Sequence, residues 1–449
     1  MRFTNLTARN EIGANCYLVE TDGRRLLLDC GSHPRIEGTE ALPRLDLLAE
    51  RGPDAVLVSH GHLDHLGSLP VLAERFPEAA VCMSHGTAAI ADRALHNSAS
   101  VMIRQRSELD LPDYPLFTHG QVDRLLERTC ALPVGRGVDV AGVETTLFEA
   151  GHVQGATGVW IEAEGASLFY TGDVKFSGMR ITRGAIFPDR TPDAMVLECT
   201  RGNTQSQPDF SWDAEAARFA RGIREVHEGG GSVLIPCFAL GKTQEILKLF
   251  HDFIREGLLP KQRFYLGGLG AAYNEVYDDL AETLPRLCPR FRLRRDVMSR
   301  RLNPREAAAT DLDGGQVFLV SSGMMTPGTS SHVLARRMVR EARHAVFFVG
   351  YVDPESPAGR LKTAGQGGRA DLGGDAGIAD IRCRIESFDF TSHCNREHMA
   401  DYVVRIAPPR VLLVHGDTPA LEWMQRELQR RLPASRVLIP PVGEGFDLA

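Results

Sequence analysis

The sequence lacks any apolar run that approaches the roughly 18 to 20 residues of a membrane-spanning helix. Its first residues, Met1-Arg2-Phe3-Thr4-Asn5, also lack the apolar core of a signal peptide. We therefore expect a cytoplasmic protein that has no membrane partner.

The sequence also lacks a disulfide framework. Its nine cysteines are an odd number and include no C-x-x-C pair. A chain of 449 residues can form extensive cores of its own, so we expect reduced, mostly buried thiols. The length predicts two domains of ordinary size, or one domain with a large insertion.

An excess of positive charge is absent as well, since the formal net charge is −7. This charge argues against non-specific coating of nucleic acid by the whole surface, although two bound dications would reverse the sign within a cleft. The notable basic run covers residues 290–295 and continues at Arg300-Arg301. A solvated face is the commoner meaning of such a run, and a contact with an RNA backbone is the alternative, because Phe291 lies among the arginines.

What the sequence does contain is a dense group of ionisable residues directly after the apolar run Ala55–Val58. His60, His62, Asp64 and His65 fall within six consecutive positions. A strand that ends at this run projects the first two histidines to one side, and a helix that follows turns the other two residues back toward them. Packing gives no reason to concentrate ionisable groups in this way. Imidazole and carboxylate suit borderline divalent ions such as zinc, so the cluster predicts the start of a dinuclear site.

The spacing H-x-H-x-D-H resembles the signature of the metallo-β-lactamase superfamily. Three further stretches resemble its other motifs: Leu-Leu-Leu-Asp-Cys-Gly, which contains Asp29, Gly-His at His152, and Thr-Gly-Asp at Asp173. Taken alone, each of these residues is an ordinary turn residue after an apolar run. The resemblance implies that Asp29 orients a ligand or the metal-bound water. It implies one zinc ion on His60, His62 and His152, a second on Asp64, His65 and His415, and Asp173 bridging both.

Later motifs narrow the resemblance to the β-CASP nucleases of that superfamily. Glu198 and Thr200 follow an apolar run, His393 ends the stretch from Ile385, and His415 follows Arg410–Val414, where RNA-acting members typically have a histidine. Between them, repeated units of strand, glycine and helix predict a parallel α/β domain.

The fold class that follows is α/β, a metallo-β-lactamase αββα sandwich with an inserted parallel α/β β-CASP domain. We predict that residues 1–205 form the first part of the metallo-β-lactamase domain, 206–362 the insertion and 363–449 the second part. The chain departs from the family pattern at residues 267–270 and 355–358, and Asn395 occupies a position where the family has an acidic residue.

Four residues of the insertion are candidate phosphate contacts. Lys242 lies at a predicted helix N-terminus, and Ser321, Ser322 and Gly323 offer hydroxyl and backbone donors after a strand. A glycine turn that binds no ligand is the alternative for the last three.

The resemblance implies a zinc-dependent RNA nuclease, and among such nucleases it favours an endoribonuclease. It also implies two Zn²⁺ per chain, with Mn²⁺ as the alternative metal. Hydroxide activated by both ions would attack the phosphodiester. The catalytic set is Asp29, Asp64, Glu198 and His393, with the last two protonating the leaving alkoxide. RNA is the expected partner, and a homodimer is left open.

Three other functions compete with this hypothesis. A hydrolase of a small phosphodiester or ester is favoured by the altered loops at 267–270 and 355–358. A DNA nuclease is disfavoured by His415. A non-catalytic scaffold for RNA processing is disfavoured because all seven metal-ligand positions are filled.

Overall fold

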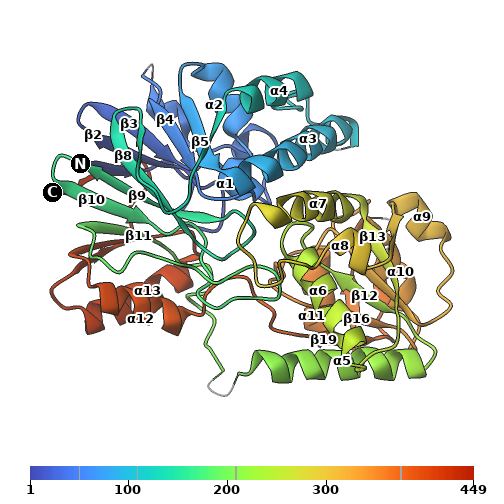
Figure 1. Cartoon of the computed structure of the whole chain (residues 1–449). Helices are drawn as coiled ribbons and strands as arrows, with labels where there is room; N and C mark the ends of the chain where they lie inside the picture. The colour runs from blue at the N-terminus through green and yellow to red at the C-terminus, as the bar shows by residue number, and fades with distance from the viewer. Residues whose placement is uncertain (50, 109, 208–209, 375–376, 449) are drawn as a thin grey trace. The chain divides into compact units, whose positions relative to one another are not determined.

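The computed structural model describes residues 1–49, 51–108, 110–207, 210–374 and 377–448 (Figure 1). The chain forms two compact units. Unit 1 comprises Met1–Gly178, Gly184–Ser206 and His393–Ala449, and unit 2 comprises Met179–Arg183 and Gln207–Ser392.

Unit 1 contains two seven-stranded sheets. The first has the order β22 (Gly445–Asp447), β1 (Arg2–Asn5), β2 (Tyr17–Thr21), β3 (Arg24–Leu28), β4 (Ala55–Val58), β5 (Ala80–Ser84) and β6 (Thr129–Leu132). The second has the order β21 (Arg436–Leu438), β20 (Arg410–Val414), β11 (Ala194–Glu198), β10 (Ala166–Tyr170), β9 (Thr157–Ala163), β8 (Val143–Glu149) and β7 (Val138–Val140).

The two sheets pack face to face, and helices cover both outer faces. Strand β4 shows why, because successive side chains point to opposite faces. Leu57 packs in a core with Val159 and Leu168 of the second sheet, whereas Val56 and Val58 pack with α3 (His85–Glu108) and α4 (His119–Glu127). Helices α12 (Arg396–Ile406) and α13 (Thr418–Arg431) cover the outer face of the second sheet (Figure 1). The helices of unit 1 are α1 (Leu63–Leu66), α2 (Leu69–Arg75), α3 (His85–Glu108), α4 (His119–Glu127), α12 (Arg396–Ile406) and α13 (Thr418–Arg431).

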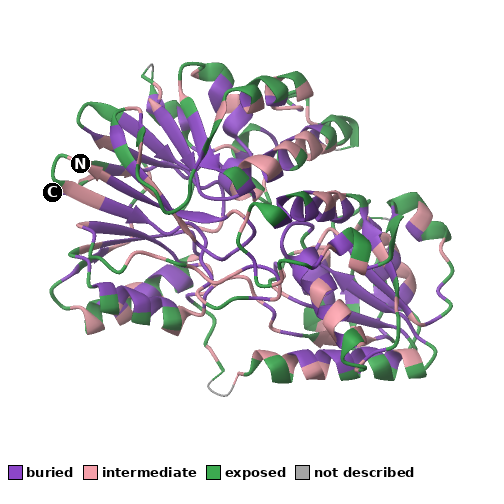
Figure 2. Ribbon diagram, viewed as in Figure 1, coloured by how far each residue is buried: buried purple, intermediate pink, exposed green. Residues whose placement is uncertain are grey.

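Unit 2 is built on a six-stranded sheet in which every neighbouring pair is parallel. Its order is β14 (Ser299–Leu302), β13 (Arg263–Gly267), β15 (Gln316–Val320), β12 (Val233–Pro236), β16 (Ala345–Phe348) and β19 (Arg384–Ser387), beside an antiparallel pair, β17 (Arg369–Asp371) and β18 (Ile378–Asp380). Its helices are α5 (Trp212–Glu228), α6 (Lys242–Arg255), α7 (Gly268–Asp279), α8 (Leu293–Asp296), α9 (Pro304–Ala309), α10 (Ser330–Met338) and α11 (Pro357–Ala364). The central strands are buried while several helices show an exposed side, as expected for a parallel sheet with helices on its faces (Figure 2).

The packing of residues 363–392 differs from the predicted division of the chain. These residues belong to unit 2, where β19 pairs with β16 at the edge of the parallel sheet. The two units are defined by contacts within the structure, whereas the predicted boundaries follow the domains of the family. The predicted boundaries therefore stay a prediction.

Two further expectations concern cysteines and membranes. All nine cysteines are free thiols, and seven of them are buried, as predicted; Cys288 is half-buried and Cys130 is exposed. Among the described residues, no helix has the length and apolarity needed to cross a bilayer.

Candidate metal centre

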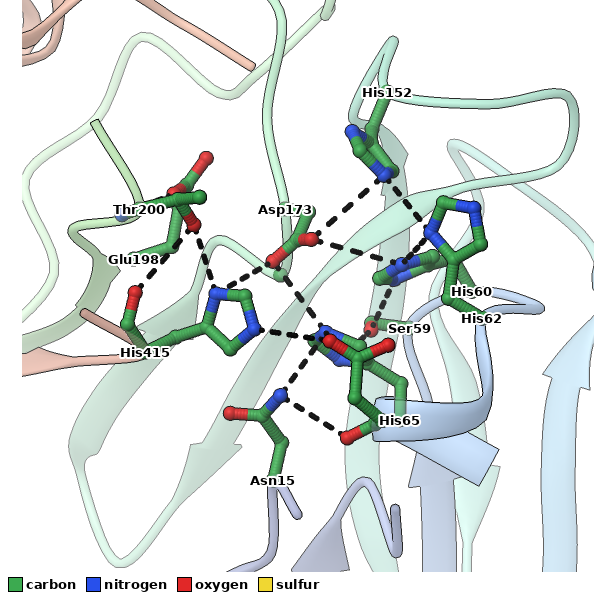
Figure 3. Close-up of polar contacts among 12 residues, drawn as sticks. Asn15, Ser59, His60, His62, His65, His152, Asp173, Glu198, Thr200 and His415 are labelled. Atoms are coloured by element: carbon green, nitrogen blue, oxygen red, sulfur yellow. Dashed lines mark hydrogen bonds and ion pairs between the residues drawn. The ribbon is translucent and has the colours of Figure 1, made fainter. Parts of the chain in front are cut away.

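The predicted ligands of unit 1 gather at one edge of its sheets (Figure 3). His60 and His62 follow β4, whereas Asp173 follows β10 and His415 follows β20. Strands β10, β11 and β20 are parallel neighbours, so their carboxyl ends meet at the same edge. The fold therefore brings together side chains that are more than 350 residues apart, as between His60 and His415.

Three imidazoles form the first group of this centre. The Nδ1 atom of His62 lies 3.1 Å from Nε2 of His60 and 3.1 Å from Nε2 of His152. An Oδ2 atom of Asp173 lies 3.7 Å from the Nε2 atoms of both His60 and His152. Four ligand atoms at about 2.1 Å from one ion lie about 3.4 Å from one another in a tetrahedron. The observed spacing therefore fits one metal ion.

A second group forms on the other side of Asp173. The Nε2 atom of His415 lies 3.3 Å and that of His65 3.8 Å from Oδ2 of Asp64. The other oxygen of Asp173, Oδ1, lies 3.5 Å from Nε2 of His65 and 3.4 Å from Nδ1 of His415. Asp173 thus turns one oxygen toward each group. Together the donor sets fit two metal ions on either side of a shared carboxylate.

The charges at the centre also fit a bound cation. Burial and the neighbouring imidazoles lower the pKa of His60, which keeps it neutral as a ligand must be. Burial would likewise lower the pKa of His65, but Asp173, Asp29 and Asp64 together raise it to about 10. Without a metal, protonated His65 thus supplies positive charge that the buried carboxylates need. In addition, buried Oδ1 of Asp173 has no hydrogen-bond donor within the described part of the chain.

Asp29 contacts the ring of His65, and its predicted role in orienting a metal ligand stays a prediction. Its carboxylate is fully buried and lies 2.7 Å from Nδ1 of His65. It also accepts hydrogen bonds from the backbone and hydroxyl of Ser59 at 2.6 and 2.8 Å and from the Tyr170 hydroxyl at 2.6 Å. With one ring nitrogen of His65 bonded to Asp29, the Nε2 atom is directed at the centre.

The loop that follows Asp29 has to approach helix α1 closely. A Cβ atom at Gly31 would lie 1.7 Å from the carbonyl oxygen of Asp64. Only glycine permits this approach, and the backbone N–H of Cys30 donates to the His65 carbonyl at 2.8 Å. The loop therefore fixes the short helix that carries two ligands.

Sequence reasoning missed the polar residues that support these ligands, above all Asn15 and Tyr170. The Asn15 side-chain amide donates to the Asp64 carbonyl at 3.0 Å and lies 3.1 Å from Nε2 of His65 (Figure 3). The Tyr17 hydroxyl donates to Oδ1 of Asn15 at 2.7 Å. The available signal was weak: an amide before one apolar run and a phenol at the end of another, with no characteristic spacing.

Glu198 and His393 form a pair beside the two groups. The Oε1 atom of Glu198 lies 3.4 Å from Nδ1 of His393, and Oδ2 of Asp173 lies 3.9 Å from the same atom. Burial would raise the pKa of Glu198, but His393 and other donors lower it to about 2, so the carboxylate is ionised at neutral pH. Glu198 also accepts hydrogen bonds from the backbones of Val174 and Thr200 at 3.1 and 2.9 Å. The imidazole of His393 retains 18% exposure and can reach a bound molecule.

Three of the four candidate phosphate contacts directly follow strand β15 of unit 2, and the fourth, Lys242, is the first residue of α6. Lys242 is buried, and its ammonium group donates to the carbonyl of Phe390. Ser321 and Ser322 are half-buried after β15, and Gly323 is buried. Their role in substrate binding stays a prediction.

The basic run of unit 2 is largely paired with acidic side chains. Arg292 pairs with Glu282, Arg294 with Asp278 at 3.4 Å, Arg295 with Asp296 at 2.8 Å, and Arg301 with Glu275. This pairing favours the solvated-face interpretation over a contact with an RNA backbone.

Three family models match the chain. The metallo-beta-lactamase superfamily matches residues 9–198, the Beta-Casp domain residues 243–361, and the Zn-dependent metallo-hydrolase RNA specificity domain residues 378–440. The first match contains six of the seven proposed ligands, which are His60, His62, Asp64, His65, His152 and Asp173. The third contains His415 and His393.

Curated relatives match over nearly the whole chain. Cleavage and polyadenylation specificity factor subunit 3 of Dictyostelium discoideum is 28% identical, over 98% of this chain and 56% of the relative. Endoribonuclease YSH1 of Eremothecium gossypii is 27% identical, over 93% and 55%. Integrator complex subunit 11 of Danio rerio is 26% identical, over 99% and 73%. The chain thus spans little more than half the length of the first two relatives.

Among solved structures, a protein of unknown function from Enterococcus faecalis V583 is similar with a TM-score of 0.59. The two share 13% sequence identity, and the match covers 99% of each chain. This likeness concerns the fold alone.

Proposed function

Because the chain belongs to the β-CASP branch of the metallo-β-lactamase superfamily, we propose that it is a metal-dependent ribonuclease that hydrolyses phosphodiester bonds in RNA. The observation that carries the proposal is Asp173, whose two oxygens face two separate groups of ligand atoms. The name of the Eremothecium gossypii relative, an endoribonuclease, supports the same activity. Endonucleolytic action, a cytoplasmic location and a homodimer stay predictions.

We propose zinc as the resident metal, with manganese as the alternative, because imidazole and carboxylate ligands suit both. When bound, two such ions would supply hydroxide at neutral pH and positive charge beside the phosphate that is attacked. The first ion would be held by His60, His62 and His152, the second by Asp64, His65 and His415, and both by Asp173.

The remaining steps fall to protein groups. Glu198 is ionised and faces Nδ1 of His393, so it can accept a hydrogen bond from that nitrogen. The other ring nitrogen is then the group that passes a proton to the leaving alkoxide. Asp29 keeps His65 oriented throughout, because it bonds the ring nitrogen that faces away from the centre.

The proposed ribonuclease activity is tested with a structured RNA that is labelled in parallel at either end. Zinc-loaded protein, its His65→Ala variant and a His96→Ala variant are compared on a denaturing gel. His96 is the matched control, because it is a half-buried histidine of α3 that bonds His119 and lies outside the centre. We expect discrete internal bands from the wild type and His96→Ala, and at least a thousandfold slower cleavage by His65→Ala, roughly the loss seen when a catalytic constellation is broken.

Metal content gives an independent readout. We expect two ions per chain in the wild type and in His96→Ala, and fewer in His65→Ala, by elemental mass spectrometry. Intact RNA in the presence of two bound ions per chain would overturn the ribonuclease proposal and favour the hydrolase of a small phosphodiester or ester.

A further inference from the structure

Exposed aromatic side chains are confined to one place in the structure. The chain has twenty Phe, eight Tyr and three Trp, all within the described residues. Of these, only Phe238 and Tyr351 are exposed, at 43% and 48%. Every other aromatic ring in this described part is buried or half-buried. Exposure of a large apolar ring has a solvation cost, so two rings confined to one region indicate a binding surface.

Both residues follow the carboxyl ends of strands in the parallel sheet of unit 2. Phe238 follows β12, Tyr351 follows β16, and these strands are direct neighbours. Strand β15, which precedes Ser321 and Ser322, lies on the other side of β12. Adjacent strands are about 4.8 Å apart, so the residues that carry these hydroxyl groups and rings follow neighbouring strands in the order β15, β12 and β16.

The loop that carries Phe238 is well supported. The Phe238 carbonyl accepts hydrogen bonds from the backbone and the hydroxyl of Thr243 at 3.3 and 2.9 Å. A Cβ atom at Gly323 would lie 3.4 Å from the backbone nitrogen of Phe238, so the loop after β15 packs directly against it. The ring is therefore presented by a fixed backbone.

We propose that Phe238 and Tyr351 form a stacking platform for unpaired bases of single-stranded RNA. The inference rests on the proposed function and names the part of unit 2 that holds the substrate. Every base has a flat face that can stack on an aromatic ring, and hydroxyl groups beside the rings can bond the sugar-phosphate backbone. Stacking also suits a chain with a net charge of −7, whose basic run is largely paired with acids.

The first test measures binding without cleavage. Metal-chelated protein is titrated into a fluorescent uridine 12-mer, and into a 12-mer with the same backbone but no bases. The variants are Phe238→Ala, Phe238→Leu, which keeps apolar bulk without an aromatic face, and Met298→Ala as control. Met298 is 87% exposed and precedes β14, at an outer edge of the same sheet.

We expect both Phe238 variants to bind the uridine 12-mer about fivefold to a hundredfold more weakly, the range for loss of one stacked base. The base-free 12-mer should bind equally to all proteins, and Met298→Ala should match the wild type. Wild-type affinity of both Phe238 variants for the uridine 12-mer would overturn the proposal. An equal loss toward both oligonucleotides would overturn it as well, and would indicate a loop defect or a contact with the backbone.

The second test separates this inference from the proposed ribonuclease. With zinc-loaded protein and a cleavable single strand, Phe238→Leu should raise KM about tenfold and leave kcat within about twofold. If the wild type cleaves RNA and this variant has unchanged KM, the stacking platform is wrong and the ribonuclease stands. If the wild type cleaves no RNA but the binding difference persists, the ribonuclease is wrong and the platform stands.

Discussion

Asp29 in unit 1 and Glu245 in unit 2 are both buried carboxylates that accept four hydrogen bonds. Asp29 accepts from two groups of Ser59, from Tyr170 and from His65, at 2.6 to 2.8 Å. Glu245 accepts from backbone N–H groups of Arg180, Ile181 and Thr182 and from the Thr182 hydroxyl, at 2.6 to 2.9 Å. The hydrogen bonds that each carboxylate accepts are therefore similar in number and in length.

The difference lies in what each carboxylate holds. Asp29 bonds the ring of a predicted metal ligand, so it controls the direction of a nitrogen that faces the centre. Glu245 bonds three consecutive backbone N–H groups, so it fixes the path of the segment Met179–Arg183 within unit 2. Burial and full hydrogen bonding are thus the same physical requirement in both places, and the two carboxylates differ in their partner, which is a predicted metal ligand for Asp29 and a backbone segment for Glu245.

The largest effect is expected from a substitution of Asp29. In Asp29→Asn, one of the donors that faced the carboxylate loses its acceptor, and the ring of His65 loses a charged partner. Loss of such support typically costs about tenfold to a hundredfold in metal affinity or activity. We expect that decrease in affinity for one ion per chain, measured by competition with a chromophoric chelator, and in kcat. Unchanged affinity for both ions would show that Asp29 is only a structural residue.

A smaller effect is expected from a substitution of Glu245. Glu245→Gln keeps the shape of the side chain but turns an NH₂ group toward backbone N–H donors, of which at least one loses its acceptor. A buried donor left unpaired costs about 1–3 kcal/mol, so we expect about 2 kcal/mol less stability in unit 2. Because the chain has two units, hydrogen exchange of peptides from α6 and from β4 reports each unit separately.

Hydrogen exchange, metal content and kcat of the same variant together test the distinction between Asp29 and Glu245. Glu245→Gln should speed exchange in α6 while both metal ions and kcat stay as in the wild type. If the variant loses a metal ion instead, Glu245 acts on the centre and the distinction drawn between the two carboxylates is wrong.

The sequence predicts one of these carboxylates and not the other, for a physical reason. Asp29 closes an apolar strand beside a group of histidines, and ligands at strand ends are predictable because parallel strands share an edge. The resemblance that these motifs carry implies the α/β fold class and the superfamily, and both are confirmed. Glu245 lies on a helix more than 60 residues from its partners, and no local pattern encodes that contact.

Two other features escaped prediction because they depend on packing. Strand β19 has a half-exposed, charged sequence that shows no apolar alternation, yet it pairs with β16. Lys242 lies at a helix start, and the sequence does not encode the hydrogen bond that its buried ammonium group donates to the Phe390 carbonyl; its phosphate contact stays a prediction. Motif spacing indicates which residues meet at a strand end, whereas the direction of a long side chain is decided by its neighbours.

The smallest effect comes from a third carboxylate, Asp296, which is bonded but lies near the surface. Arg295 donates to it from two nitrogens at 2.8 and 2.9 Å and, as the main cause, lowers its pKa from 3.8 to about 2. Arg295 is 65% exposed, so water and salt screen the pair, and we expect Arg295→Ala to lower stability only slightly. Since the folded-state pKa is depressed, this contribution is present above about pH 4 and is lost as the pH falls toward 2. Hydrogen exchange of α8 in both proteins at pH 7, at low and high salt, measures the difference, which salt should reduce. A salt-independent loss as large as that of Glu245→Gln would mean that burial is not what separates Asp29 and Glu245 from an ordinary surface pair.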